Sequence, residues 1–254
     1  MTARAAGGSL DLRAPRFMSD LHLAEEQPRT VEHFLTLVRD CRGGELVILG
    51  DLFEYWPGDD EVGHGIGAIV ASALRGARAR GTDIYLMQGN RDMLLGDAFA
   101  SAAGATLLPD PCRSVVDGAS TLLSHGDAYC TRDRAYMVFR KITRMKAVQR
   151  LFLSQSPQRR RALMGQVRRR SEAGKRMLAE DIMDVTPSAI DQALRAAGAQ
   201  RMIHGHTHRP GLHRFEVDGH GAERWVLPDW DFDGPQPRGG YLRVAGGRPE
   251  IVPV

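Results

Sequence analysis

The first 90 residues alternate short apolar runs with helical patterns, and this alternation limits the folds that the chain can adopt. The apolar runs at 16–20, 45–50 and 83–89 are long enough for buried strands and too short for helices. Between them, 30–41 and 65–80 repeat apolar side chains at helical spacing. Consecutive strands joined by helices run parallel, so this order predicts a parallel sheet with helices on its faces.

After residue 112 the sequence pattern changes from strand-like to helical and then back to strand-like. Short strand patterns occur in pairs after residue 112 and again after residue 200, whereas residues 131–198 have a helical pattern. We therefore predict an α/β protein with a single domain over 15–254, interrupted by a helical insertion at about 131–198. Residues 1–14, rich in Ala, Gly and Arg, are expected to form a flexible tail.

Polar clusters follow the predicted strands directly. In chain order their members are Asp20 and His22; Asp51 and Glu54; Asn90, Arg91 and Asp92; His125 and Asp127; and His204, His206 and His208. Ligands of α/β sheets bind at the carboxyl ends of strands, so we expect these clusters to converge. Carboxylate, carboxamide and imidazole groups together suit Mn²⁺, Fe²⁺ or Zn²⁺. They are numerous enough for two ions, which is the arrangement that phosphatases and nucleases use.

The remaining histidines are weaker candidates for metal ligands. A single Asp-x-His after a strand is usually structural, and the inference above depends on several clusters occurring in one chain. His204 precedes a glycine within a predicted strand and can act either as a metal ligand or as a support for one. The histidines outside the clusters are expected to be surface or core residues; they are His33, His64, His213 and His220.

Over about 16–230, the ordered clusters resemble the calcineurin-like metallophosphoesterases, whose core is a β-sandwich flanked by helices. The matching residues are Asp20-x-His22, Gly50-Asp51, Gly89-Asn90, His125 and Gly205-His206-x-His208. The resemblance implies that one metal is held by Asp20, His22, Asp51 and His208. It implies that the second metal is held by Asp51, Asn90, His125 and His206, with Asp51 as the bridging ligand.

Arg91 departs from the pattern of that family. Most members have a histidine after Gly-Asn, where it can protonate a leaving group. An arginine is not a general acid near neutral pH, but its guanidinium suits phosphate oxygens. A phosphate monoester anion can leave without protonation, so a pyrophosphate bond is the expected target. Asp51, Asn90 and Arg91 are the predicted catalytic residues.

Longer segments narrow the resemblance to the UDP-2,3-diacylglucosamine diphosphatases of lipid A synthesis in Gram-negative bacteria. The similar segments are 48–60, 89–96, 124–140, 182–185 and 203–210. That family hydrolyses the pyrophosphate of its lipid-linked UDP-sugar substrate to UMP and 2,3-diacylglucosamine 1-phosphate, typically with Mn²⁺. The resemblance implies substrate contacts by Asn90, Arg91, Asp133, Ser171, Lys175 and His206. The spacing around 171–185 differs, and Pro228 stands where that family has glycine.

Charge is distributed unevenly along the chain. Residues 140–176 hold 13 Lys and Arg against one acid, Glu172, whereas the other 217 residues hold 21 Lys and Arg against 30 Asp and Glu. Such a block suits nucleic acid, an anionic membrane or a phosphorylated ligand. Segment 136–153 has the pattern of one amphipathic helix. With the resemblance, we expect a lid whose apolar face shelters acyl chains and whose basic face, including Arg159–Arg161 and Arg168–Arg170, meets anionic lipid.

The location expected for such a protein is the cytoplasmic face of the inner membrane, with peripheral attachment. The sequence has no apolar run of about 18 residues and no secretory signal. The sequence has three cysteines, an odd number, and no CxxC motif. We therefore expect them to be reduced thiols. No nucleic-acid partner and no obligate protein partner is expected.

Two alternatives remain open. The first is a metal-dependent phosphoesterase for nucleotides or dinucleoside polyphosphates, which would not need a long amphipathic insertion. The second is a nucleic-acid-binding protein or nuclease that uses the basic block. Residues 157–176 contain no aromatic side chain for stacking on bases, which disfavours the second alternative.

Overall fold

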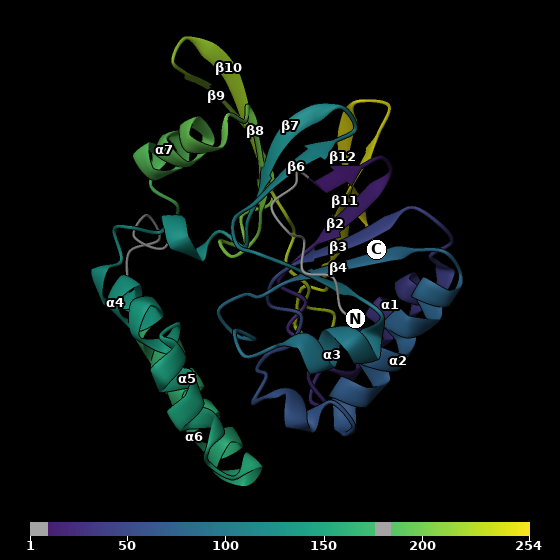
Figure 1. Ribbon diagram of the computed structural model, residues 1–254, viewed down its shortest axis with the longest axis vertical. Coiled ribbons are helices and arrows are strands. Elements are labelled where there is room, and N and C mark those ends of the chain that lie inside the picture. The colour runs from purple at the N-terminus through teal and green to yellow at the C-terminus, as the bar shows by residue number, and fades with distance from the viewer. Residues whose placement is uncertain (1–9, 176–183) are drawn as a thin grey trace.

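Two six-stranded sheets form the centre of the molecule (Figure 1). The structure is a computed structural model that describes residues 10–175 and 184–254, without the side chains of 167–175. The first sheet has the order β12 (Arg248–Pro253), β11 (Gly240–Ala245), β2 (Pro15–Met18), β3 (Glu45–Leu49), β4 (Asp83–Met87) and β5 (Thr106–Leu108). The second has the order β1 (Leu10–Leu12), β6 (Cys112–Val116), β7 (Ala119–Leu123), β8 (Arg201–His204), β10 (His220–Val226) and β9 (Gly211–Val217).

Strand β3 shows how the layers are built. Leu46 and Ile48 belong to the apolar cluster under the helices, whereas Val47 and Leu49 belong to the cluster between the sheets. This alternation follows from the two-residue period of a strand. Three helices cover the first sheet: α1 (Pro28–Asp40), α2 (Gly65–Ala79) and α3 (Asp97–Ala103). Helix α7 (Pro187–Ala197) covers the outer face of the second sheet.

The expected α/β sandwich is confirmed, with differences at short elements. β2, β3 and β4 pair in parallel, as the βαβαβ pattern predicts. β1 pairs in parallel with β6, so the expectation of a flexible tail is wrong for residues 10–12, and residues 1–9 lie outside the described part. α3 and β5 follow the fourth strand without having been predicted; they have 7 and 3 residues.

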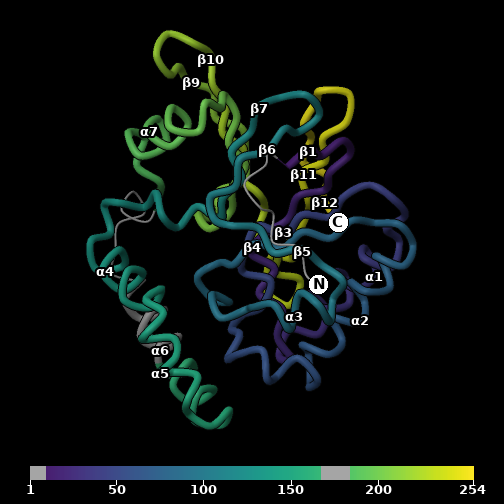
Figure 2. The backbone as a smooth tube through the Cα atoms, viewed as in Figure 1, coloured from purple at the N-terminus to yellow at the C-terminus, as the bar shows by residue number. Residues whose placement is uncertain are grey.

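The helical insertion divides into two parts. α4 (Arg134–Thr143), α5 (Lys146–Leu153) and α6 (Pro157–Lys175) form an arm beside the sandwich, visible as the teal and green helices of Figures 1 and 2. We call α4–α6 the lid. α7, by contrast, buries Ile190 and Leu194 against the second sheet and belongs to the sandwich.

The prediction of one continuous helix over 136–153 is wrong. Met145 has an extended conformation, with ψ of 124°, and separates α4 from α5. The Gln149 amide donates a hydrogen bond of 3.1 Å to the Thr143 carbonyl, which lies in the last turn of α4. The apolar period continues across the break, which explains why the pattern resembles one helix.

Arg160 attaches the lid to the sandwich. Its guanidinium is 1% exposed, donates to the Pro57 carbonyl at 2.7 Å and pairs with Asp60, while the neighbouring Arg161 pairs with Glu61. The prediction that Arg159–Arg161 face lipid is therefore wrong for Arg160. Arg160 contacts a segment about 100 residues away in the sequence, and the local charge pattern could not predict this contact.

We expect Arg160→Met to loosen the end of the lid. Methionine keeps the apolar stem but leaves the buried Pro57 carbonyl without its donor, which costs about 1–3 kcal/mol. Hydrogen–deuterium exchange of 146–163 should accelerate accordingly. Arg161→Met is the matched control, because an exposed ion pair contributes only about 0–1 kcal/mol. Equal exchange in the two variants would contradict this role of Arg160.

Candidate metal centre

The predicted ligands lie where the strands of both sheets end. Asp20 and His22 follow β2, Asp51 follows β3, and Asn90 follows β4. The second sheet supplies the remaining histidines after β7 and β8: His125, His206 and His208. A facing pair of sheets thus brings together residues that are up to 188 positions apart in the sequence.

The backbone at these positions is strained. Seven non-glycine residues of the described chain have a φ in the left-handed region, and five of them are predicted ligands: Asp20, His22, Asp51, His206 and His208. Their φ angles lie between 49° and 69°. Each costs of order 1 kcal/mol or more, and such residues concentrate at functional sites. The other two, Asp117 and Asp218, precede glycines in turns between strands.

Asp20, His22 and His208 form the first donor group. Nε2 of His208 lies 3.4 Å from Oδ1 of Asp20, and Nε2 of His22 lies 4.0 Å from the same oxygen. That oxygen is buried and has no hydrogen-bond partner. Burial alone would raise the pKa of Asp20, but the close approach and charge of His208, together with His125 and His22, hold this pKa well below its usual value. Asp20 is therefore a carboxylate directed at two imidazoles.

Asp20, Asp51 and His125 form the second donor group. Oδ1 of Asp51 lies 3.7 Å from Nε2 of His125, and its Oδ2 lies 4.0 Å from Nε2 of His22. The two oxygens of Asp51 thus face histidines of different groups. Nδ1 of His125 lies 3.0 Å from the Leu49 carbonyl, which can only accept, so Nδ1 carries the hydrogen and Nε2 faces the site.

Asn90 and His206 complete this group. Oδ1 of Asn90 lies 3.0 Å from Nε2 of His125, and the rings of His125 and His206 are 5.1 Å apart. Burial lowers the pKa of His206 to about 3. Burial also opposes a charge on His125, but the carboxylates of Asp51 and Asp20 raise its pKa to about 9. The surrounding carboxylates therefore favour a positive charge at this point.

Three acidic residues support the donors. Asp92 accepts the N–H groups of Gly89 and Leu52 at 2.8 Å each and thereby fixes both loops. Glu54 lies against His22, and Asp229 lies 3.5 Å from Nδ1 of His208. Glu54 and Asp92 belong to the polar clusters of the sequence, but only the fold reveals their partners. Asp229 was not predicted, because no local pattern in the sequence relates it to His208.

His204 is a supporting residue. Arg224 donates to its Nε2 at 3.1 Å, so Nδ1 carries the hydrogen and faces the Gly205 carbonyl at 2.8 Å. Burial and the charge of Arg224 lower the pKa of His204 to about 4. Both ring nitrogens are occupied by protein groups, which leaves neither for a metal.

The predicted substrate residues lie on two sides of this centre. Arg91 follows Asn90, and its N–H donates to Oδ1 of Asp51 at 2.8 Å. Asp133 accepts the N–H of Tyr136 at 2.8 Å and begins α4. Ser171 and Lys175 belong to α6, but their side chains lie outside the described part, as do those of Arg168–Arg170.

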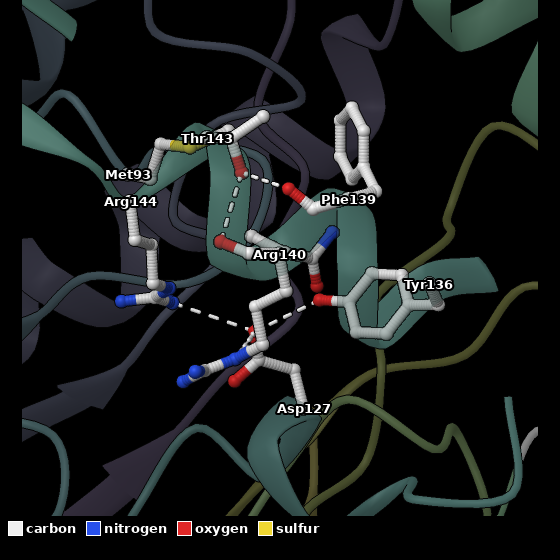
Figure 3. Close-up of a pocket in the computed structure, with 8 residues that line it drawn as sticks. Met93, Asp127, Tyr136, Phe139, Arg140, Thr143 and Arg144 are labelled. Atoms are coloured by element: carbon white, nitrogen blue, oxygen red, sulfur yellow. Dashed lines mark hydrogen bonds and ion pairs between the residues drawn. The ribbon is translucent and has the colours of Figure 1, made fainter. Parts of the chain in front are cut away.

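A narrow pocket lies between α4 and the segments that carry Asn90 and Asp127 (Figure 3). Tyr136 and Arg140 of α4, and Arg144 directly after it, point toward Asp127, and the first two reach its Oδ2 at 2.8 Å each. Burial disfavours the charge of Asp127, but His125 and Arg144 hold its pKa well below the usual range. Asn90 lines the same pocket, so the basic residues Arg140 and Arg144 lie close to one of the predicted metal donors.

The donor set fits divalent metal ions. It combines carboxylate, imidazole and carboxamide groups without a thiolate. Asp20 belongs to both groups, and its buried Oδ1 has no hydrogen-bond partner. Such a set suits Mn²⁺, Fe²⁺ or Zn²⁺. A helix-flanked β-sandwich that gathers these donors where its strands end is a metal-dependent phosphoesterase. The structure therefore defines the class of the protein.

Comparison with known proteins identifies the family. The chain is 47% identical over 250 residues to the UDP-2,3-diacylglucosamine hydrolase of Ralstonia nicotianae, covering 94% of this chain and 91% of that protein. It is 48% identical over 219 residues to the protein of the same name from Marinobacter nauticus, covering 85% and 88%. The chain belongs to the UDP-2,3-diacylglucosamine hydrolase family. No family model matches it. Among solved structures, an archaeal phosphodiesterase shares 11% identity and a TM-score of 0.49, covering 95% of this chain and 99% of its own.

Proposed function

We propose that the protein hydrolyses the pyrophosphate bond of UDP-2,3-diacylglucosamine to UMP and 2,3-diacylglucosamine 1-phosphate. The observation that carries this proposal is the adjacency of Arg91 to two donor groups that share Asp20. Such a site suits a phosphoanhydride, whose leaving group needs no proton. The names of the relatives supply the substrate.

We propose two Mn²⁺ ions as the cofactors. Asp20, His22, Asp51 and His208 would hold one ion, and Asp51, Asn90, His125 and His206 would hold the other. Bound there, the ions would supply a nucleophilic water at neutral pH and offset charge on the phosphoryl oxygens. The orientation of Asp51, with one oxygen toward each group, supports its assignment as the bridging ligand.

Arg91 binds the phosphate chain in this proposal. Its side chain is 20% exposed, so it can meet a ligand, and its guanidinium has more donors than Glu54 occupies. Water attacks the phosphorus on the uridine side, and the lipid-linked sugar phosphate leaves with the electrons of the broken P–O bond. We propose Asn90, Asp133, Ser171, Lys175 and His206 as further substrate contacts.

Release of UMP tests the proposed function. The purified protein should form UMP from UDP-2,3-diacylglucosamine with Mn²⁺, lose this activity with a chelator and regain it when Mn²⁺ is restored. In ¹⁸O-labelled water the label should enter UMP. No UMP with Mn²⁺ present, combined with hydrolysis of dinucleoside polyphosphates, would reject this substrate.

We also propose that the lid meets the acyl chains and the cytoplasmic face of the inner membrane as a peripheral contact. Large apolar side chains are exposed along α4 and α5, including Val138 at 59%, Met145 at 50% and Leu151 at 70%. Lys146 and Arg150 are exposed on the same segment. Among the described residues, no helix is long and apolar enough to cross a bilayer.

Leu151→Glu should weaken binding to vesicles that contain anionic phospholipid. Losing the burial of one leucine, about 1.5 kcal/mol, corresponds to about a tenfold weaker affinity. Co-sedimentation with the vesicles measures the effect. Ile69→Glu is the matched control, because Ile69 is 50% exposed on α2, away from the lid. If both variants bind like the original protein, the lid is not the membrane contact.

A further inference from the structure

Glu54 is a buried carboxylate that touches two different parts of the site. Its side chain is 7% exposed, with Oε2 at 3.1 Å from Nδ1 of His22 and Oε1 at 2.9 Å from NH1 of Arg91. We propose that Glu54 is a positioning residue that orients His22 for metal binding and Arg91 for the substrate. The second half of this inference rests on the proposed function.

The backbone holds Glu54 in place for both contacts. Its N–H donates to the Leu23 carbonyl at 3.2 Å, and the preceding residue, Phe53, forms a parallel bridge with Leu23. The loops after β2 and β3 are thus joined beside the site. The carboxylate lies between the two side chains because these loops run alongside each other.

The contact with His22 determines which of its nitrogens is available. Nδ1 of His22 has no hydrogen-bond partner besides this ion-pair contact, and a carboxylate only accepts, so the contact favours the tautomer with the hydrogen on Nδ1. Nε2 then keeps its lone pair, and it lies 4.0 Å from both Asp20 and Asp51. Glu54 therefore orients His22 so that the lone pair of Nε2 is available to a cation.

The contact with Arg91 places a mobile side chain. The main-chain N–H of Arg91 is already bound to Asp51, but its guanidinium ends a long flexible stem. The ion pair with Glu54 holds that group beside the donors before the substrate arrives. This contact is a partly buried, charge-assisted hydrogen bond, which is among the stronger polar contacts in a protein. Substrate therefore meets an arginine that is already ordered.

Glu54→Gln tests both contacts. Glutamine has the same size but one accepting oxygen, so it can serve only one of the two donors and turns an NH₂ group toward the other. We expect calorimetry of the metal-free protein to show Mn²⁺ affinity reduced by about 10–100-fold. At saturating Mn²⁺, the KM for UDP-2,3-diacylglucosamine should rise by about tenfold.

Two further variants separate positioning from folding. Glu45→Gln removes a carboxylate at the opposite end of β3, where it accepts from Arg13 and Ala14, and should leave Mn²⁺ affinity and KM unchanged. In an Arg91→Ala background, Glu54→Gln should add no further rise in KM while still weakening Mn²⁺ binding. That pattern is expected only if Glu54 acts on the substrate through Arg91.

Two results would overturn the inference. Unchanged Mn²⁺ affinity in Glu54→Gln would reject the role toward His22. An equal rise in KM with and without Arg91 would reject the role toward the substrate. If the original protein releases no UMP, the proposed function fails, but the calorimetric comparison of Glu54→Gln with Glu45→Gln still decides the role of Glu54 at the metal centre.

Discussion

Asp51→Asn is expected to reduce turnover of UDP-2,3-diacylglucosamine by at least about 1,000-fold, equivalent to about 4 kcal/mol of transition-state free energy. Asp51 is 2% exposed and directs one oxygen toward each donor group. Asparagine keeps the acceptor for the N–H of Arg91 but lacks the charge and second oxygen that a shared ligand needs. UMP release under saturating Mn²⁺ measures the loss.

The thermal stability of the same variant distinguishes lost metal binding from misfolding. The original protein should gain about 2.7 kcal/mol at Mn²⁺ concentrations 100-fold above Kd, whereas Asp51→Asn should gain much less. Without metal, Asp51→Asn should have a stability close to that of the original. Burial and the charge of Asp51 raise the pKa of Asp92 to about 6, so neutralising residue 51 removes a repulsion, but it also removes the attraction between Asp51 and His125.

Asp117→Asn is the matched control for this experiment. Asp117 has a φ of 46°, close to the 52° of Asp51, but lies in the turn between β6 and β7. Asparagine adopts this backbone conformation readily, so the control should keep full activity and the full response to Mn²⁺. Activity of Asp51→Asn within tenfold of the control would refute the assignment of Asp51 as the shared ligand.

The ligands could be predicted from the sequence because they follow strands directly. β2, β3 and β4 have continuous apolar patterns, and the parallel order of such strands brings their carboxyl ends to one edge. Asp20, Asp51 and Asn90 are adjacent in space for that reason. The likeness to a known family then supplied the roles of His206 and His208, which come from the other sheet.

The supporting contacts could not be predicted, because they join segments distant in sequence. Asp229 reaches His208 from the connection after β10, and no local pattern relates the two residues. Arg160 belongs to a run of arginines that is typical of a solvated surface, yet the loop at 57–60 buries it. β1 has only three residues, which is too few to show the alternating pattern of a strand. Only its pairing with β6 identifies it as a strand.

The break between α4 and α5 could not be predicted from the local sequence pattern either. The apolar period of 136–153 is satisfied by two helices as well as by one. Three-dimensional contacts decide between them, since Arg140 in the first helix and Arg144 directly after it are bound to Asp127. Periodicity predicts which side chains share a face, but tertiary anchors decide where a helix ends.

Gly205→Ala is expected to disable the metal centre through a single methyl group. Gly205 lies between His204 and His206, and a Cβ at this position would collide with Ser19 Oγ and Asp20 Oδ2. Both residues are fully buried, and Asp20 Oδ2 already accepts from Ser19 at 2.6 Å and from the N–H of His206 at 2.8 Å. Because these groups cannot withdraw, Asp20 should move out of register with His22 and His208. We expect Mn²⁺ affinity to fall by at least about 100-fold, as when a metal ligand loses its support, and folding stability to fall by about 1–3 kcal/mol.

Gly221→Ala in β10 separates this steric effect from the general cost of replacing a glycine. No atom lies within 4 Å of a Cβ built at Gly221, and neither glycine has a φ in the left-handed region, so the two variants differ in available space alone. The control should bind Mn²⁺ and release UMP like the original protein. Calorimetry with Mn²⁺ and thermal unfolding of both variants measure the difference. Mn²⁺ affinity in Gly205→Ala equal to that of Gly221→Ala would show that Asp20 is not confined by Gly205, and that the close packing of the loops after β2 and β8 is not what positions the ligands.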